Sequence, residues 1–282
     1  MQNLTFSNMM DKFSGLKRER LLLLKLLCFI LLCFGIKPTL SAKESPFLSG
    51  EKIVYKIFYN WNFVWLSAGE MVFEVKDEGN FYHIEATGMT YSSYEWFYKV
   101  RDKFHTYIDK KTLRPILYIR DIHEGSYDHY EKIIFDYSTH LIHSHTGTNM
   151  NTTKLTIISM QEEVNDLIST FYHLRSFDRT LLKSKSRIPF KMILDNEIYN
   201  LNIICENESK LSVKESGDYN VLNCLTQVIV GNTFRKNTSL KINVADDENK
   251  LPVLIESPLS VGSVKAILKS YEKLKYPFSA KY

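Results

Sequence analysis

Short runs in which apolar and polar residues alternate fill most of the chain, and each run ends at a cluster of turn residues. Residues 71–75 and 82–86 show the pattern, with the turn cluster at 77–80 between them. Side chains of a β-strand point alternately to its two faces, so this period of two is typical of strands with one buried face. The pattern continues over residues 107–145 and 188–268. The sequence therefore predicts a mainly β protein built from hairpins.

One segment follows a different period. Its apolar residues are spaced i, i+3, i+4, i+7: Val164, Leu167, Ile168, Phe171 and Leu174. This spacing places them on one face of a helix, which we expect over residues 164–182. An amphipathic helix between two runs of strands packs against the sheet. The predicted fold is a curved antiparallel sheet, β-roll or barrel-like, with a central helix.

Two distant stretches, residues 109–125 and 246–262, share one frame of Asp, five residues, Pro, nine residues and Gly. The anchors that match at one constant offset are Asp109, Pro115 and Gly125 with Asp246, Pro252 and Gly262. Proline at the first residue of a strand removes no ladder hydrogen bond that the sheet needs. We interpret the frame as an internal structural repeat, with halves at about 48–150 and 186–275. The alternative is coincidence between two hairpins.

The first 42 residues have the anatomy of a secretory signal peptide. Basic residues at 17, 18 and 20 precede an apolar run over 21–36, and small residues at 39–42 offer a cleavage site. The alternative is an uncleaved membrane anchor, but the run falls short of the roughly 20 residues that a bilayer requires. We expect cleavage near Ala42, which leaves 43–282 as a single mainly β domain.

Cleavage changes the charge balance. The whole chain has 36 basic and 32 acidic residues, and residues 1–42 contain six basic and two acidic ones. The mature chain therefore has 30 of each and no formal net charge. Nucleic-acid binding loses its main electrostatic argument.

Two of the four cysteines, Cys205 and Cys224, lie outside the predicted signal peptide. In an exported chain they can form one disulfide across neighbouring strands. The alternative is a pair of buried thiols, because the sequence does not give the distance between their Cα atoms.

Familiar catalytic motifs are absent from the sequence: GxSxG, the Walker loop, GxGxxG and HExxH. We therefore expect neither an enzyme nor a cofactor.

Three histidines that could bind a metal lie close together in the sequence: His140, His143 and His145. The last two share one face of a strand and are close enough to share a metal. The alternative, which we prefer, is a solvated polar strand with no metal.

Aromatic residues gather between positions 55 and 98. They suit strands and cores, so a filled core explains them simply. The functional alternative is an apolar cavity or docking patch for a lipid or a partner. The residues that we predict to bind such a ligand are Tyr55, Tyr59, Trp61, Trp65 and Trp96.

Three segments resemble the bacterial family called domain of unknown function 3108. They are GEKIVYKIFYNWNFVWLSAGEMVFEV (50–75), VNDLISTFYHLRSFD (164–178) and VADDENKLPVLIESPLSVGSVKAIL (244–268). The resemblance implies an exported, mostly β bacterial protein with no established activity or site residues. The turn-and-Pro units are also similar to those of the curved half-barrels of periplasmic lipoprotein carriers, which is an analogy of fold alone.

We therefore expect a non-enzymatic protein of the periplasm or cell envelope. Its expected partner is an apolar ligand, such as a lipid or a lipoprotein acyl chain, or another envelope protein. The alternatives are a structural or interaction protein without a ligand and a metal protein that uses the histidine cluster.

Overall fold

The structure is a computed structural model that describes residues 44–61, 64–227, 239–259 and 262–282. All of them belong to one unit of the chain, Lys43–Tyr282, and the other unit is Met1–Ala42. The predicted signal peptide, residues 1–42, lies outside the described residues.

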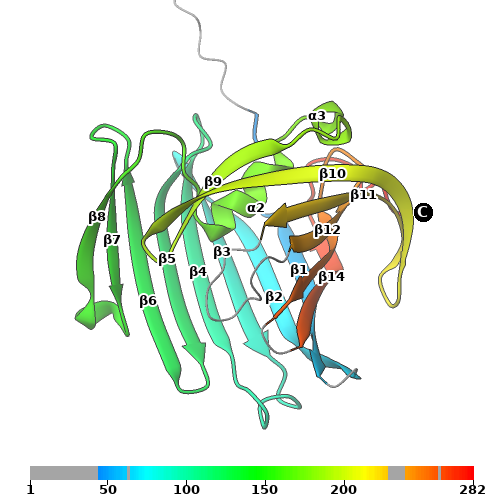
Figure 1. The fold of residues 1–282 in the computed structure, drawn as a ribbon, viewed down its shortest axis with the longest axis horizontal. Coiled ribbons are helices and arrows are strands. Elements are labelled where there is room, and N and C mark those ends of the chain that lie inside the picture. The colour runs from blue at the N-terminus through cyan, green and yellow to red at the C-terminus, as the bar shows by residue number, and fades with distance from the viewer. Residues whose placement is uncertain (1–43, 62–63, 228–238, 260–261) are drawn as a thin grey trace, which may run out of the picture. The chain divides into compact units, whose positions relative to one another are not determined.

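The described residues form one 14-stranded sheet in which neighbouring strands are antiparallel (Figure 1). In chain order the strands are β1 (Lys52–Trp61), β2 (Val64–Glu78), β3 (Phe81–Thr90), β4 (Arg101–Asp109), β5 (Pro115–Glu124), β6 (Tyr127–Asp136), β7 (Leu141–Gly147), β8 (Lys154–Ser159), β9 (Ile188–Leu194), β10 (Glu197–Val213), β11 (Gly217–Gln227), β12 (Ser239–Ala245), β13 (Pro252–Pro258) and β14 (Ser263–Glu272).

The sheet does not close, and its two edges are β8 and β9. Two meanders, β1 to β8 and β9 to β14, meet where β1 pairs with β14. The prediction of a mainly β, curved antiparallel fold is confirmed. The division into two repeated halves remains a prediction.

The predicted central helix is two helices, α2 (Leu167–Arg175) and α3 (Arg179–Lys183). The chain breaks between them because the Asp178 side chain accepts a hydrogen bond from Thr180 N and starts a new helix. A single turn of 3-10 helix, η1 (Met150–Thr152), precedes β8. Within the described ranges, no helix has the length and apolar character needed to cross a membrane.

The core lies on the face of the sheet that α2 covers. On β3, Ile84 and Ala86 are fully buried while Glu85 between them is half-buried, as a period of two requires. Ile168 and Tyr172 of α2 belong to the same buried cluster. α2 packs against β4 and β9, so it lies between the first meander and the far edge of the second (Figure 1).

Polar contacts hold the turn between β9 and β10 against the first meander. Asp195 in this turn forms an ion pair with Arg120 on β5, and the Asn196 amide contacts the Thr146 hydroxyl on β7. The sheet therefore curls so far that the β9–β10 hairpin at one edge reaches strands near the other edge. In Figure 1, β9 and β10 cross above α2.

The shared frame has the same local geometry in both places. Pro115 and Pro252 each begin a strand, and Gly125 and Gly262 each have a positive φ, of 61° and 75°. Only glycine adopts this backbone region without a steric cost.

Candidate functional site

α2 begins at a buried capping residue, Asp166. Its carboxylate accepts hydrogen bonds from the backbone N–H groups of Ile168 and Ser169, both at 2.8 Å. It also accepts one from the Thr106 hydroxyl on β4, at 2.7 Å. Burial raises the pKa of Asp166, although these donors act in the opposite direction. The cap fixes the start of the helix to the sheet.

α2 ends at a buried ion pair. Arg175 donates to both carboxylate oxygens of Glu51, at 2.7 and 2.9 Å, and its Nε donates to Asn249 O at 3.0 Å. Burial opposes the charge of Arg175, but the Glu51 carboxylate raises the pKa of Arg175. The pair joins the start of β1, the end of α2 and the turn before β13. These places lie in the three segments that carry the family resemblance.

An apolar cavity of about 380 Å³ lies beside α2. Its walls are the α2 face and the inward side chains of the second meander, with two residues from β2. The lining residues include Phe73, Leu167, Phe171, Leu174, Phe190, Leu201, Ile203, Ile242 and Val244. The polar side chains among the lining residues are those of Thr170, Arg175, Thr226, Lys250 and Ser257.

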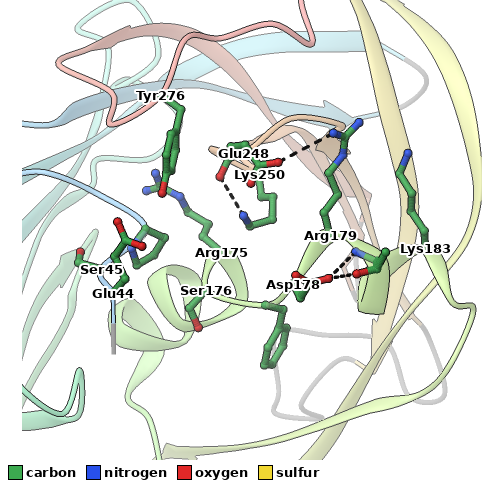
Figure 2. A pocket seen from close by; sticks show the side chains of 13 residues that line it. Glu44, Ser45, Arg175, Ser176, Asp178, Arg179, Lys183, Glu248, Lys250 and Tyr276 are labelled. Atoms are coloured by element: carbon green, nitrogen blue, oxygen red, sulfur yellow. Dashed lines mark hydrogen bonds and ion pairs between the residues drawn. The ribbon is translucent and has the colours of Figure 1, made fainter. Parts of the chain in front are cut away.

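A second hollow, polar and of about 650 Å³, opens at the ends of α2 and α3 (Figure 2). Two lining residues, Arg175 and Lys250, are shared with the apolar cavity. The cationic side chains of the hollow are those two with Arg179 and Lys183. The two spaces therefore meet at a wall that carries positive charge.

Lys250 is the cation in this wall for which the described residues provide no carboxylate partner. It is 8% exposed, and its Nζ donates to Glu248 O at 2.8 Å. Among the described residues, no carboxylate lies within ion-pair distance of this Nζ. Burial lowers the pKa of Lys250, while the nearby Glu248 carboxylate raises it.

The turn that carries Lys250 is fixed by Asp247. The Asp247 carboxylate accepts from the backbone N–H of Asn249 at 2.9 Å and from that of Lys250 at 3.2 Å. Lys250 has a φ of +50°, a conformation that non-glycine residues rarely adopt. This turn geometry directs the lysine to the wall between the two spaces.

The other two cations of the hollow share one carboxylate. Arg179 Nε lies 2.6 Å from Asp246 Oδ1, and Lys183 Nζ lies 2.9 Å from Asp246 Oδ2. Both side chains are partly exposed in the hollow, where Figure 2 shows them beside each other. Asp246 therefore offsets part of the positive charge there.

Tyr55, which we predicted to bind ligand, is a core residue. It is 2% exposed, its hydroxyl donates to Pro252 O at 2.8 Å, and its ring meets the Phe171 ring edge-on. It supports the wall of the cavity from behind but does not line it.

The structure spreads the other predicted aromatics over separate places. Tyr59 is half-buried, Trp96 is 77% exposed, and Trp65 lies under Lys265 Nζ at 4.0 Å from its ring centre. Trp61 ends β1, and its side chain lies outside the described residues. None of the predicted aromatics whose side chains are described lines the apolar cavity.

Sequence reasoning missed the cavity residues of the second meander and Lys250. The helical stripe, at Leu167, Ile168, Phe171 and Leu174, was noticed and does line the cavity. Lys250 lies inside the repeated frame, two residues before Pro252. The signal that could have identified it is a lysine in the polar turn before a buried strand.

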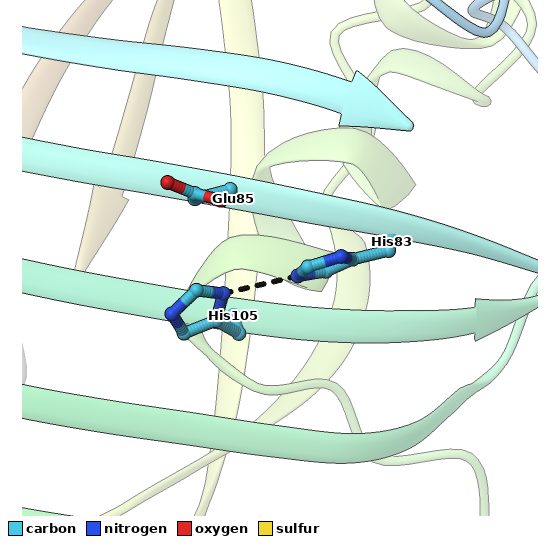
Figure 3. Close-up of side chains that lie close together, drawn as sticks. All are labelled: His83, Glu85 and His105. Atoms are coloured by element: carbon cyan, nitrogen blue, oxygen red, sulfur yellow. Dashed lines mark hydrogen bonds between the residues drawn. The ribbon is translucent and has the colours of Figure 1, made fainter. Parts of the chain in front are cut away.

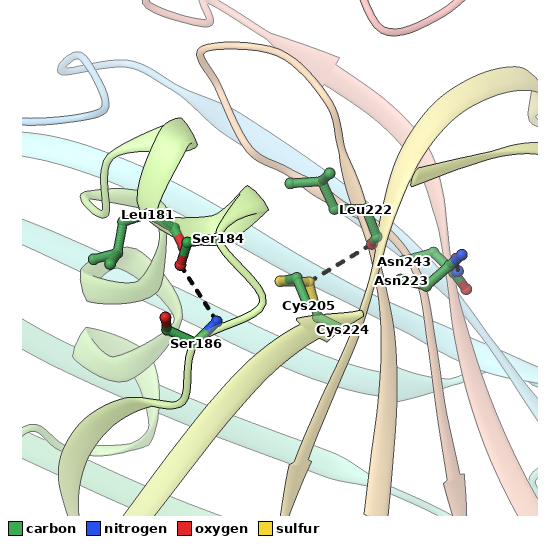
Figure 4. Close-up of a disulfide and its surroundings, with 8 residues drawn as sticks. All are labelled: Leu181, Ser184, Ser186, Cys205, Leu222, Asn223, Cys224 and Asn243. Carbon is green, nitrogen blue, oxygen red and sulfur yellow. Dashed lines mark hydrogen bonds between the residues drawn. A yellow bond between two sulfur atoms is a disulfide. The ribbon is translucent and has the colours of Figure 1, made fainter. Parts of the chain in front are cut away.

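Cys205 on β10 and Cys224 on β11 face each other in register and are joined by a disulfide (Figure 4). Both are buried, in a cluster that includes Leu182 of α3 and Leu222. The bridge links two strands of the second meander whose inward residues line the cavity.

His143 and His145 share the outer face of β7, because their neighbours in the strand, Ile142 and Ser144, are fully buried on the other face. His140 lies in the preceding turn with a φ of +57°. Within the described residues, these three are not a group of metal-ligand atoms.

The family model that matches the chain is described as "Protein of unknown function (DUF3108)" and covers residues 54–269. The chain belongs to the DUF3108 family. The match contains every residue of the apolar cavity, as well as Lys250 and Arg175. The DUF3108 resemblance expected from the three segments is thereby confirmed. Comparison with curated proteins gives no match.

Among solved structures, this DUF3108 chain is similar to the crystal structure of a β-barrel-like protein of domain of unknown function DUF1849 from Brucella abortus. The TM-score is 0.55 and the sequence identity is 6%, over 81% of this chain and 100% of the other. At this identity the likeness concerns the fold alone. It agrees with the predicted barrel-like curvature.

Proposed function

We propose that this DUF3108 protein is an exported, non-enzymatic envelope protein that binds a lipid with one acyl chain and an anionic headgroup. The acyl chain occupies the apolar cavity, and the headgroup lies at Lys250. The observation that carries the proposal is the meeting of an apolar cavity with a polar hollow at one wall, which contains Lys250.

The cavity suits an acyl chain rather than a polar ligand. Its volume of about 380 Å³ falls within the range of small-molecule sites. Most of its lining side chains are apolar, such as those of Phe171, Leu174 and Ile242, so water finds few hydrogen-bond partners there. Cavities of this kind favour apolar ligands. Each methylene buried there contributes about 0.8 kcal/mol.

The headgroup assignment depends on how the cations are paired. Glu51 neutralises Arg175, and Asp246 lies between Arg179 and Lys183. Lys250 remains, mostly buried and without a carboxylate partner among the described residues. A buried charge is costly until it is paired, so a carboxylate or phosphate at this wall stabilises the protein as well as the complex.

The envelope location is supported by the signal-peptide pattern of residues 1–42 and by the buried disulfide. Disulfides persist in oxidising compartments such as the periplasm and are rare in the cytosol. The lack of familiar catalytic motifs in the sequence supports a binding role.

Mass spectrometry of the mature protein, first under native conditions and then after solvent extraction, tests the proposal. We expect a co-purifying single-chain lipid at near one per protein, or one-to-one binding of added dodecanoate. A protein that carries no lipid and binds no dodecanoate would instead support the alternative of an interaction protein without a ligand.

The headgroup is tested with Lys250→Met, which keeps an unbranched apolar stem and removes the charge. We expect at least a tenfold loss of dodecanoate affinity and little change for dodecanol, measured by calorimetry. Lys185→Met, at an exposed lysine that lines neither the apolar cavity nor the polar hollow, is the matched control. Equal losses for both ligands would contradict a headgroup contact at Lys250.

A further inference from the structure

A group of potential metal ligands lies on the face of the sheet opposite the core. His83 and Glu85 are on β3 and His105 is on the adjacent β4, where it pairs with Glu85 (Figure 3). Ile84, between the first two, points into the core. The period of two therefore places all three side chains together on the outer face.

The ligand atoms are close enough for one ion. His83 Nε2 and His105 Nδ1 are 3.0 Å apart, and one ligand atom from each of the three residues lies within 4.8 Å of the others. Two nitrogens bound to one tetrahedral zinc ion at about 2.0–2.1 Å are roughly 3.3 Å apart. A small opening of the histidine pair therefore makes room for an ion.

A second carboxylate orients His83 for this role. Glu78 Oε1 lies 2.7 Å from His83 Nδ1 and accepts a hydrogen bond from the Nδ1–H group. The Nε2 lone pair of His83 then faces His105. A carboxylate behind a metal-binding histidine is the usual outer partner in zinc sites. The Tyr107 ring stacks on His83 at 4.3 Å, and His83 is 7% exposed. The imidazole is thus held in one orientation.

One cation competes for the group. Lys76 Nζ lies 2.6 Å from Glu85 Oε2. The second oxygen of Glu85 remains for a metal, and the lysine side chain is 46% exposed and can turn into solvent.

We propose that His83, His105 and Glu85 bind one divalent transition metal ion of the zinc type, with a fourth position open to water. Two imidazoles and one carboxylate with an open position are a common zinc ligand set. The site is independent of the proposed lipid site, because it lies on the other face of the sheet.

The test uses the mature protein after treatment with EDTA, titrated with Co²⁺ and Zn²⁺. We expect one Co²⁺ per chain with the strong visible absorption of a tetrahedral site, displaced by Zn²⁺. His83→Gln and His105→Gln should each weaken binding at least 100-fold. The matched control is the double variant His143→Gln, His145→Gln, which removes the other same-face histidine pair.

Two further variants keep the proposal open to refutation if a histidine variant misfolds. Lys76→Met should tighten binding, because it removes the competing cation. Glu78→Gln should weaken it about 10- to 100-fold, as loss of an outer partner does. Failure of the parent protein to bind either metal would overturn the proposal. So would unchanged affinity in all of these variants, or loss of binding in the control alone.

Discussion

At the scale of single residues, two buried cations at one wall differ in how their charge is balanced. Arg175 is bidentate to Glu51, whereas Lys250 donates to a backbone carbonyl. The first arrangement is complete and holds segments together. The second leaves a charge available to a ligand. This difference in pairing is why we assign a structural role to Arg175 and a binding role to Lys250.

Arg175→Met should therefore destabilise the folded protein rather than change its ligand specificity. It leaves the Glu51 carboxylate buried and unpaired, which costs about 3–5 kcal/mol. Urea unfolding measures the loss, with exposed Arg187→Met as the control. Combining Arg175→Met with Glu51→Leu should recover part of the stability, because no unpaired charge then remains buried. A double variant less stable than Arg175→Met alone would contradict this explanation.

Glu131 on β6 gives the protein a pH dependence. It is fully buried, and burial raises its pKa to about 7 even though Arg120 Nε lies 3.2 Å away and acts to lower it. The ordinary pKa of a glutamate side chain is 4.5. Between this pH and about pH 7, Glu131 therefore keeps its proton in the folded protein but loses it in the unfolded chain. The free energy of unfolding should fall by about 1–3 kcal/mol as pH rises from about 4.5 to about 7.

Glu131→Gln should remove the part of this decline that Glu131 contributes, because the amide does not titrate. Denaturant unfolding across the pH range, with the two proteins side by side, measures the difference. Parallel curves for the two proteins would show that Glu131 titrates normally in the folded state.

At the scale of elements, α2 serves both as a cover for the sheet and as a wall of the cavity. Its periodicity was visible in the sequence because burial on one face of a helix repeats locally. The end of the helix was not predicted correctly: the stripe continues to Leu182, but Asp178 caps a second helix.

Filling the cavity from α2 should block the ligand. Leu174→Trp places a larger side chain in the cavity, and Leu181→Trp on α3 is the control, because Leu181 is 41% exposed and does not line the cavity. We expect Leu174→Trp to reduce dodecanoate affinity at least tenfold and the control to match the parent protein. Similar affinities in all three proteins would place the ligand elsewhere.

At the scale of the whole domain, the sheet was predictable and the site was not. Alternation reports which side of a strand is buried, so the β content and the buried faces of the strands followed from local pattern. The wall with Lys250 is formed by contacts between residues far apart in the sequence, such as those that Arg175 makes with Glu51 and with Asn249. No local period encodes such contacts. Among the predicted aromatics whose side chains are described, Tyr55 belongs to the core, whereas Trp65 and Trp96 are exposed and none lines the cavity.

The volume of the cavity sets a limit on the chain that it accepts. Along a series of linear fatty acids, affinity should rise about fourfold with each methylene, which corresponds to about 0.8 kcal/mol. The rise should stop once the chain fills about 380 Å³. Calorimetry on the series measures the slope, and a flat series would contradict burial of the chain.

The pairing of β1 with β14 also has a consequence for synthesis of the chain. β1 is among the first strands to leave the ribosome, and its partner on one side is the last strand of the sheet. Until β14 emerges, β1 is an unpaired edge at which chains can associate wrongly. Contacts of such long sequence separation also slow folding. We therefore expect synthesis of this chain to benefit from factors that keep nascent chains apart until the last strand is made.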